Sequence, residues 1–280
     1  MDTLVSVDWL ADHLNDPDLV VLDCSVHVEQ TESGMRTLSG REDYDGGHIP
    51  GAGFADLKGD LCDSESPIGF AVPTPEAFCA AMSKLGVGDE SRVVLYDSSS
   101  SVWAARVWWM LRWVGFDRAA ILDGGLNAWK AAGHSLSTEP ATYPARTLTP
   151  NPRPQLIADR DEVLAAIDDA DVSIIDTLPA GSYRGEMKMY ARPGHILSAV
   201  NVCGMDMLDE TGRHKPMADL DAMHTGDRDA RAITYCGGGI LASLNAFVMT
   251  RLGFKDVAVY TASLQEWAAD PDNPMTSEPS

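Results

Sequence analysis

Short apolar runs alternate with stretches of helical periodicity along the whole chain. Each run is five or six residues long and ends at a polar position, a pattern that suits strands of a parallel sheet covered on both faces. In the first half, runs of this type occupy residues 19–23, 92–97 and 119–123. Amphipathic helical patterns occupy residues 5–14, 74–85 and 102–114, and Ser6 is a candidate N-cap for the first of them. The alternation predicts an α/β fold.

The same order of patterns returns in the second half of the chain. Asp176 ends an apolar run as Asp23 does, and Cys236 follows an Arg-to-Tyr run as Asp97 does, 139 residues earlier. Five prolines fall between the two halves, which is typical of an extended linker. The repeat predicts two homologous domains in tandem, each a mostly parallel sheet flanked by helices on both faces. We place them at residues 1–138 and 155–280, joined by a linker at 139–154.

Composition and charge narrow the functional classes. The 280 residues are 45% hydrophobic and carry a net charge of -21, without a cluster of Lys and Arg, which argues against nucleic-acid and membrane partners. The chain begins with acidic residues and contains no apolar run of 18, so a cytoplasmic location is expected. The five cysteines are scattered without metal-binding spacing, which favours a reducing compartment and predicts neither a metal site nor a cofactor.

One of these cysteines stands in a distinctive context. Cys236 follows an apolar run and precedes Gly237, Gly238 and Gly239, after which a helical pattern begins at Ile240. A strand, a tight loop and a helix are expected, because glycines permit backbone conformations that side chains block. Amide groups and the positive end of the helix dipole then converge on the thiol and favour its ionisation. The pattern predicts a nucleophile loop.

Four motifs relate the chain to a known family. They are Gly-His-Ile-Pro-Gly-Ala at 47–52, a partly preserved copy of this motif at 194–199, Cys-Gly-Gly-Gly at 236–239 and Ser-Leu-x-Glu-Trp-x-x-Asp at 263–270. With them the chain resembles the two-domain sulfurtransferases of the rhodanese superfamily. The resemblance implies that Cys236 carries sulfur as a persulfide, held by the loop through Leu241. It also implies that the first domain, with Asp97 at the cysteine position and serines at 98–101, is catalytically silent.

The resemblance also suggests how a sulfur donor binds. The uncharged loop is closer to that of members that prefer 3-mercaptopyruvate than to that of members that prefer thiosulfate. In such members arginines before the Gly-His motif hold the donor carboxylate, and here a serine replaces the usual one at position 182. The remaining candidates for donor binding are Arg184, Lys188, Arg192 and Ser263. Cyanide, thiols or thioredoxin are the expected sulfur acceptors.

Two other functions fit parts of the pattern. A cysteine phosphatase would need an arginine six residues after the cysteine, where this chain has Ala242, so a phosphate dianion would lack its cation. The second alternative is a catalytically weak rhodanese-like binding or sulfur-carrier protein, in which Ser182 and Leu241 replace residues needed for turnover. The retained Cys236 in a glycine loop favours the enzyme.

Overall fold

The computed structural model describes residues 1–31, 34–98 and 100–277, which fold into two compact units. The first unit comprises residues 1–64, 72–152 and 210–214, and the second comprises residues 65–71, 153–209 and 215–280. The division differs from the predicted one in two ways. The proline-rich residues 139–152 group with the first unit, and each unit includes a short segment from the other half of the chain. Ser99, within the predicted silent loop, lies outside the described residues.

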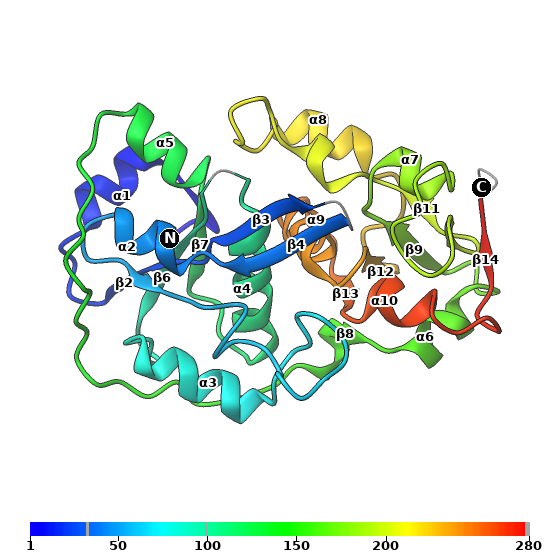
Figure 1. Ribbon diagram of the computed structural model, residues 1–280, viewed down its shortest axis with the longest axis horizontal. Coiled ribbons are helices and arrows are strands. Elements are labelled where there is room, and N and C mark those ends of the chain that lie inside the picture. The colour runs from blue at the N-terminus through cyan, green and yellow to red at the C-terminus, as the bar shows by residue number, and fades with distance from the viewer. Residues whose placement is uncertain (32–33, 99, 278–280) are drawn as a thin grey trace. The chain divides into compact units, whose positions relative to one another are not determined.

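The first unit contains one parallel sheet and a separate hairpin (Figure 1). Its strands are β1 (Leu4–Val5), β2 (Leu19–Asp23), β3 (Val26–Thr31), β4 (Gly34–Ser39), β5 (Gly53–Phe54), β6 (Arg92–Tyr96) and β7 (Ala119–Leu122). Its helices are α1 (Val7–His13), α2 (Arg41–Gly46), α3 (Pro75–Lys84), α4 (Val102–Trp113) and α5 (Gly125–Ala131). The five-stranded sheet has the order β1-β7-β6-β2-β5 with parallel neighbours, and β3 pairs with β4 antiparallel.

The second unit repeats this arrangement. Its strands are β8 (Ile157–Ala158), β9 (Val172–Asp176), β10 (His195–Ile196), β11 (Val200–Asn201), β12 (Arg231–Tyr235), β13 (Asp256–Tyr260) and β14 (Met275–Thr276). Its helices are the 3-10 turns η1 (Pro154–Leu156) and η2 (Gly204–Met207), with α6 (Arg160–Ala166), α7 (Ala180–Tyr183), α8 (Met217–Met223), α9 (Ile240–Arg251) and α10 (Ser263–Trp267). The parallel sheet has the order β11-β9-β12-β13-β8.

The two sheet orders are the same when equivalent strands are compared. The first sheet has the order β1, β7, β6, β2, β5, and the second has the order β8, β13, β12, β9, β11. Each strand of the first sheet therefore occupies the same place as its counterpart in the repeat. The predicted α/β class and the duplication are therefore confirmed. Because parallel strands share one direction, their carboxyl ends meet at one edge of each sheet, and the loops after β6 and β12 lie at that edge.

Local signals account for the helix boundaries. Ser6 accepts a hydrogen bond from the Trp9 amide at 3.1 Å, which confirms the predicted N-cap of α1. Thr74 caps α3 in the same way, with Pro75 at the first helical position. The two long helices α4 and α9 are buried over most of their surfaces, including Trp109 and Phe247. A helix that is apolar all round belongs in a core, so each of these helices anchors the loop before it.

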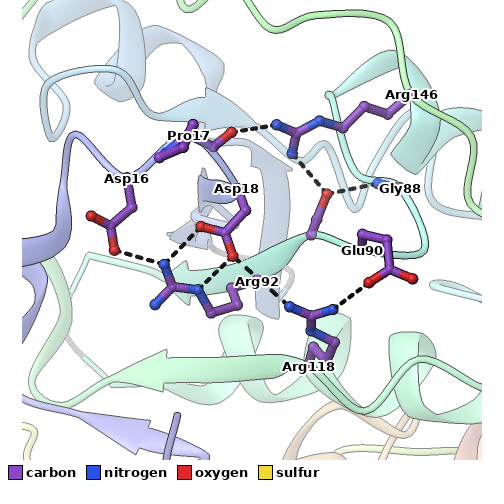
Figure 2. A network of polar contacts seen from close by, with 9 residues as sticks. Asp16, Pro17, Asp18, Gly88, Glu90, Arg92, Arg118 and Arg146 are labelled. Atoms are coloured by element: carbon purple, nitrogen blue, oxygen red, sulfur yellow. Dashed lines mark hydrogen bonds and ion pairs between the residues drawn. The ribbon is translucent and has the colours of Figure 1, made fainter.

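A network of ion pairs holds the edge of the first sheet opposite its carboxyl ends (Figure 2). Arg92, at the start of β6, donates to Asp16 at 2.6 Å and forms two hydrogen bonds of 2.8 Å with Asp18. Arg118 lies 3.8 Å from Asp18, and Arg146 of the proline-rich segment donates to the Ser91 hydroxyl at 2.9 Å. These contacts join the loop before β2 to β6 and to the segment that follows α5.

This network predicts a pH-dependent contribution to stability. The hydrogen bond from Arg92 lowers the pKa of Asp18 to about 2, below the value of about 3.9 expected in the unfolded chain. The pair therefore stabilises the fold above about pH 4, and the contribution disappears as the pH falls toward 2. Because the Asp18 side chain is 40% exposed, solvent screening limits the effect to about 1 kcal/mol.

Urea unfolding of the wild type and of Asp18→Asn should measure this contribution. We expect the variant to be less stable by about 1 kcal/mol at pH 7, and the difference to shrink between pH 5 and pH 3 (order-of-magnitude estimates). Asp12→Asn is the control, since this exposed aspartate of α1 makes none of the contacts described above. A difference that stays constant over this range would contradict the assignment.

Candidate active site

The strand, tight loop and helix predicted around Cys236 are present in the second unit, and this segment keeps the name nucleophile loop. β12 ends at Tyr235, Cys236 follows, and α9 begins at Ile240 after three buried glycines. Gly239 is the residue before the helix and has φ of 80°, a left-handed conformation that favours glycine. The first amides of the 12-residue helix α9 point back toward the loop, so they and the helix dipole provide a positive potential beside Cys236.

The other two glycines are required for a different reason, which is close approach by side chains. A Cβ atom on Gly237 would lie 1.6 Å from the Tyr190 hydroxyl oxygen, and one on Gly238 would lie 2.3 Å from Nε2 of Gln265. The loop is therefore lined by Tyr190 and Gln265, neither of which was a candidate from the sequence. The sequence contained only an indirect indication of these contacts. Consecutive glycines indicate that another group packs closely against the backbone, but they do not identify the residue that supplies it.

Backbone contacts fix the loop against the first turn of α10. The Cys236 amide donates to the Ser263 hydroxyl at 3.1 Å, and this hydroxyl donates to the Tyr260 carbonyl at 2.6 Å. The amide of Gln265 donates to the Gly237 carbonyl at 3.0 Å. Since Ser263 is fully buried and its only proton is used, its role is to position Cys236. The prediction that Ser263 binds substrate is not supported by this geometry.

Gln265 also binds a segment from the other half of the sequence. Its Oε1 accepts a hydrogen bond of 2.8 Å from the amide of Gly69, which belongs to residues 65–71 of the second unit. The Gly69 carbonyl oxygen would lie 3.3 Å from a Cβ atom on Gly238. Residues 65–71 thus lie against the nucleophile loop, a placement that no local sequence pattern predicts.

The equivalent loop of the first unit is filled by its own carboxylate. Oδ1 of Asp97 accepts 2.9 Å hydrogen bonds from the amides of Ser100 and Ser101. Oδ2 accepts hydrogen bonds of 2.9 and 3.2 Å from the amides of Trp103 and Ala104 at the start of α4. Four amides therefore converge on one anion. This contact supports the interpretation of the first loop as silent and shows that such a loop binds negative charge.

A buried carboxylate supports the strand next to the nucleophile loop. Asp176 accepts hydrogen bonds from the Leu178 amide at 2.8 Å and from the Tyr235 hydroxyl at 2.7 Å. Burial raises the pKa of Asp176 to about 6. Asp23 occupies the matching position in the first unit and accepts from the Ser25 amide at 2.8 Å. These aspartates order the turns beside the two loops.

The candidate cation Arg192 binds backbone carbonyl groups of its own unit. Its guanidinium donates to the carbonyl oxygens of five residues, at distances from 2.6 to 3.4 Å: Trp267, Ala268, Asp270, Pro271 and Asn273. These carbonyls belong to the end of α10 and the turn after it, where helix geometry leaves acceptors without partners. An arginine has five N–H donors, so none is left for a carboxylate. We therefore withdraw Arg192 from the donor site.

Replacing Arg192 should affect stability instead of donor affinity. Arg192→Ala removes the hydrogen bonds to five carbonyls, although those of Trp267 and Asp270 keep a bond from Asn273. We expect a loss of about 2–4 kcal/mol in the free energy of unfolding. The KM for the sulfur donor should stay within about twofold while the variant is folded. Chemical denaturation and donor kinetics at low temperature measure both. Arg41→Ala is the control, since this exposed arginine of the first unit pairs with Asp45. A tenfold rise in KM for Arg192→Ala would restore Arg192 to the donor site.

The two remaining candidate cations are exposed. Arg184 forms a bidentate pair with Glu186 at 2.6 and 3.0 Å, so much of its charge is compensated. Lys188 is exposed on the same segment, two residues before Tyr190. Leu241 is half-buried and packs against Gly204. A Cβ atom added to Gly204 would lie 3.0 Å from Cδ2 of Leu241. Within the described residues, no group of three or more His, Cys, Asp or Glu could hold a metal ion.

A model of the Rhodanese-like domain family matches residues 6–132 and again residues 159–270. The chain belongs to the rhodanese-like family. The two matches agree with the two sheets of equal strand order, and each includes one of the duplicated loops. None of the helices in the described part of the chain is long and apolar enough to cross a membrane.

Relatives with assigned names match over nearly the whole chain. The 3-mercaptopyruvate sulfurtransferase of Escherichia coli (strain K12) is 32% identical, over 97% of this chain and 96% of its own length. The thiosulfate/3-mercaptopyruvate sulfurtransferase 1 of Arabidopsis thaliana is 31% identical, over 99% of this chain and 78% of its own. The crystal structure of SseA from Escherichia coli has a TM-score of 0.83 at 31% identity and covers 94% of this chain and 99% of that chain.

Proposed function

We propose that this protein is a sulfurtransferase that carries sulfur on Cys236. The observation that supports this most directly is the pair of duplicated loops. In the first loop a carboxylate receives four amide hydrogen bonds, and in the second a cysteine follows the equivalent strand. A loop built to stabilise an anion stabilises a thiolate and a persulfide in the same way. Relatives that match nearly the whole chain and are named sulfurtransferases support the assignment.

The reaction has two steps on the same sulfur atom. The Cys236 thiolate attacks the outer sulfur of the donor, an S–S bond forms, and the bond from that sulfur to the remainder of the donor breaks. From 3-mercaptopyruvate the electron pair leaves with the enolate of pyruvate, which takes a proton. From thiosulfate it leaves with sulfite. An acceptor such as cyanide or a thiol then removes the outer sulfur and regenerates the thiolate.

The charge of the site favours 3-mercaptopyruvate as the donor. Arg192 is engaged by carbonyls and Arg184 by Glu186, so the loop presents neutral amides and a hydroxyl to the ligand. A dianion such as thiosulfate depends more on nearby cations than a monoanion does, because its desolvation costs more. We retain Arg184 and Lys188 as candidate cations on the segment that carries Tyr190. The whole chain, at net charge -21, adds a further unfavourable field for a dianion.

Thiocyanate formation from cyanide tests the proposal with each donor in turn. We expect kcat/KM for 3-mercaptopyruvate to exceed that for thiosulfate by about tenfold or more, a difference of about 1.4 kcal/mol. Absence of turnover with both donors would reject the enzyme. If Cys236 then still gains one sulfur atom by mass spectrometry, the alternative of a sulfur-carrier protein is the better description.

A further inference from the structure

The phenol of Tyr190 lies on the nucleophile loop. Its hydroxyl oxygen, Cζ and Cε1 would lie 1.6, 2.5 and 3.1 Å from a Cβ atom on Gly237. The ring therefore occupies the space that a side chain at position 237 would fill, directly after Cys236. Tyr190 is half-buried, so part of its side chain is exposed to solvent.

The Tyr190 hydroxyl remains a hydrogen-bond donor at neutral pH. Burial raises the pKa of Tyr190, and the negative charges of Cys236 and Asp176 raise it further. The other tyrosines of this unit use their hydroxyls within the protein: Tyr183 donates to Ala199, Tyr235 to Asp176 and Tyr260 to Glu266. Within residues 1–31, 34–98 and 100–277, no hydrogen-bond partner is found for the hydroxyl of Tyr190. A half-buried phenol usually has one, so this donor is available to a ligand.

Ser263 and Arg192, two other candidates for binding an anionic donor, already use their donor groups within the protein. The Ser263 hydroxyl holds the Cys236 amide and donates to Tyr260. Oε1 of Gln265 accepts from Gly69, although its amide nitrogen stays close to Gly238. The five N–H groups of Arg192 bind carbonyls. Tyr190 is thus the side-chain O–H donor that lies against the loop with its proton available.

We propose that Tyr190 determines recognition of the sulfur donor by donating a hydrogen bond from its hydroxyl to an anionic oxygen of that donor. The inference rests on the proposed function, because it places the donor over Gly237 with its outer sulfur toward Cys236. The oxygen is a carboxylate or enolate oxygen in 3-mercaptopyruvate and a sulfonate oxygen in thiosulfate. A neutral phenol replaces an arginine in this role, which suits a donor of low charge.

The test compares Tyr190→Phe with the wild type on three sulfur sources. Two contain anionic oxygens, 3-mercaptopyruvate and thiosulfate, and the third, inorganic polysulfide, contains none. Loss of a hydrogen bond to a charged group should reduce kcat/KM by about 10- to 100-fold for the oxygen-containing donor that the enzyme uses. Loading of Cys236 by polysulfide, followed by mass spectrometry, should change by less than about twofold, as should alkylation of Cys236 by iodoacetamide.

Equilibrium binding provides a second readout that does not depend on turnover. Pyruvate and sulfite, the two products with anionic oxygens, are titrated into the resting enzyme. Tyr190→Phe should weaken the tighter of the two by about tenfold or more. Tyr143→Phe is the matched control, since its hydroxyl binds the Val21 and Gly51 carbonyls in the first unit. The control should lower the melting temperature without changing product affinity.

The outcomes separate this inference from the proposed function. If the wild-type protein turns over neither donor, the proposed function is rejected. The affinities of the wild type and of Tyr190→Phe for pyruvate and sulfite still test the role of Tyr190 in that case. Equal losses with polysulfide and with the oxygen-containing donors would mean that Tyr190 shapes the loop instead of recognising the donor. Unchanged product affinity in Tyr190→Phe, or no affinity for either product in the wild type, would also overturn the inference.

Discussion

Cys236→Ser is expected to reduce thiocyanate formation by at least about 1000-fold with either donor. A serine hydroxyl at this position is not ionised at neutral pH and cannot form a persulfide, so the covalent intermediate is lost. The substitution is nearly isosteric, and the hydrogen bonds that fix the loop involve the backbone of residue 236. The variant should therefore fold normally. Mass spectrometry after incubation with donor should show no added sulfur.

The remaining four cysteines are suitable controls for this experiment. Burial raises the pKa of each of them: Cys24, Cys62, Cys79 and Cys203. Thiols held in the protonated state are poor nucleophiles. Cys203→Ser, in the same unit as Cys236, should retain activity within about threefold. If activity survives in Cys236→Ser and is lost in Cys203→Ser, the nucleophile is Cys203 and not Cys236.

Gly237→Ala is expected to slow loading of Cys236 by about 100-fold. Its Cβ atom would overlap the Tyr190 hydroxyl oxygen at 1.6 Å and the ring carbon Cζ at 2.5 Å. Either the loop or the tyrosine must move by more than 1 Å, and displacements of about that size at a reacting atom cost about two orders of magnitude in rate. The rate of persulfide formation with polysulfide measures the effect without involving donor recognition.

A second substitution tests whether this overlap is the cause. Tyr190→Ala removes the ring, so the double variant with Gly237→Ala should regain at least about tenfold in the loading rate. Gly46→Ala is the glycine control, because no atom lies within 4 Å of its Cβ position. If Tyr190→Ala gives no recovery, the defect of Gly237→Ala arises from the backbone of the loop and not from the ring.

The features that sequence could predict are those encoded by local patterns and by the repeat. The strand-loop-helix at Cys236, the N-cap at Ser6 and the α/β class were all correct. The repeat also identified the equivalence of Asp97 and Cys236, which the matching sheet orders confirm. In each case the determining residues are neighbours in the chain or occupy the same place in both halves.

The features that sequence missed depend on contacts between distant segments. Arg192 was assigned to the donor because an arginine before the Gly-His motif fits a carboxylate, but its partners lie more than 70 residues away along the chain. Tyr190 was overlooked because only the fold brings it to Gly237, 47 positions later. The Gly69–Gln265 contact spans 196 positions. Residue type could suggest a chemistry for these side chains, but not the partner that each one has.

The occupied loop of the first unit has a consequence for how the chain responds to salts. A site already filled by Asp97 has no place for a dissolved anion, so sulfate or phosphate does not bind there and cannot shift the unfolding of that unit by mass action. The loop at Cys236 carries no such internal carboxylate. Small inorganic anions that bind its amides favour the folded second unit and compete with the sulfur donor for the same amides. The two halves of the duplicated fold are thus expected to differ in their sensitivity to dissolved anions.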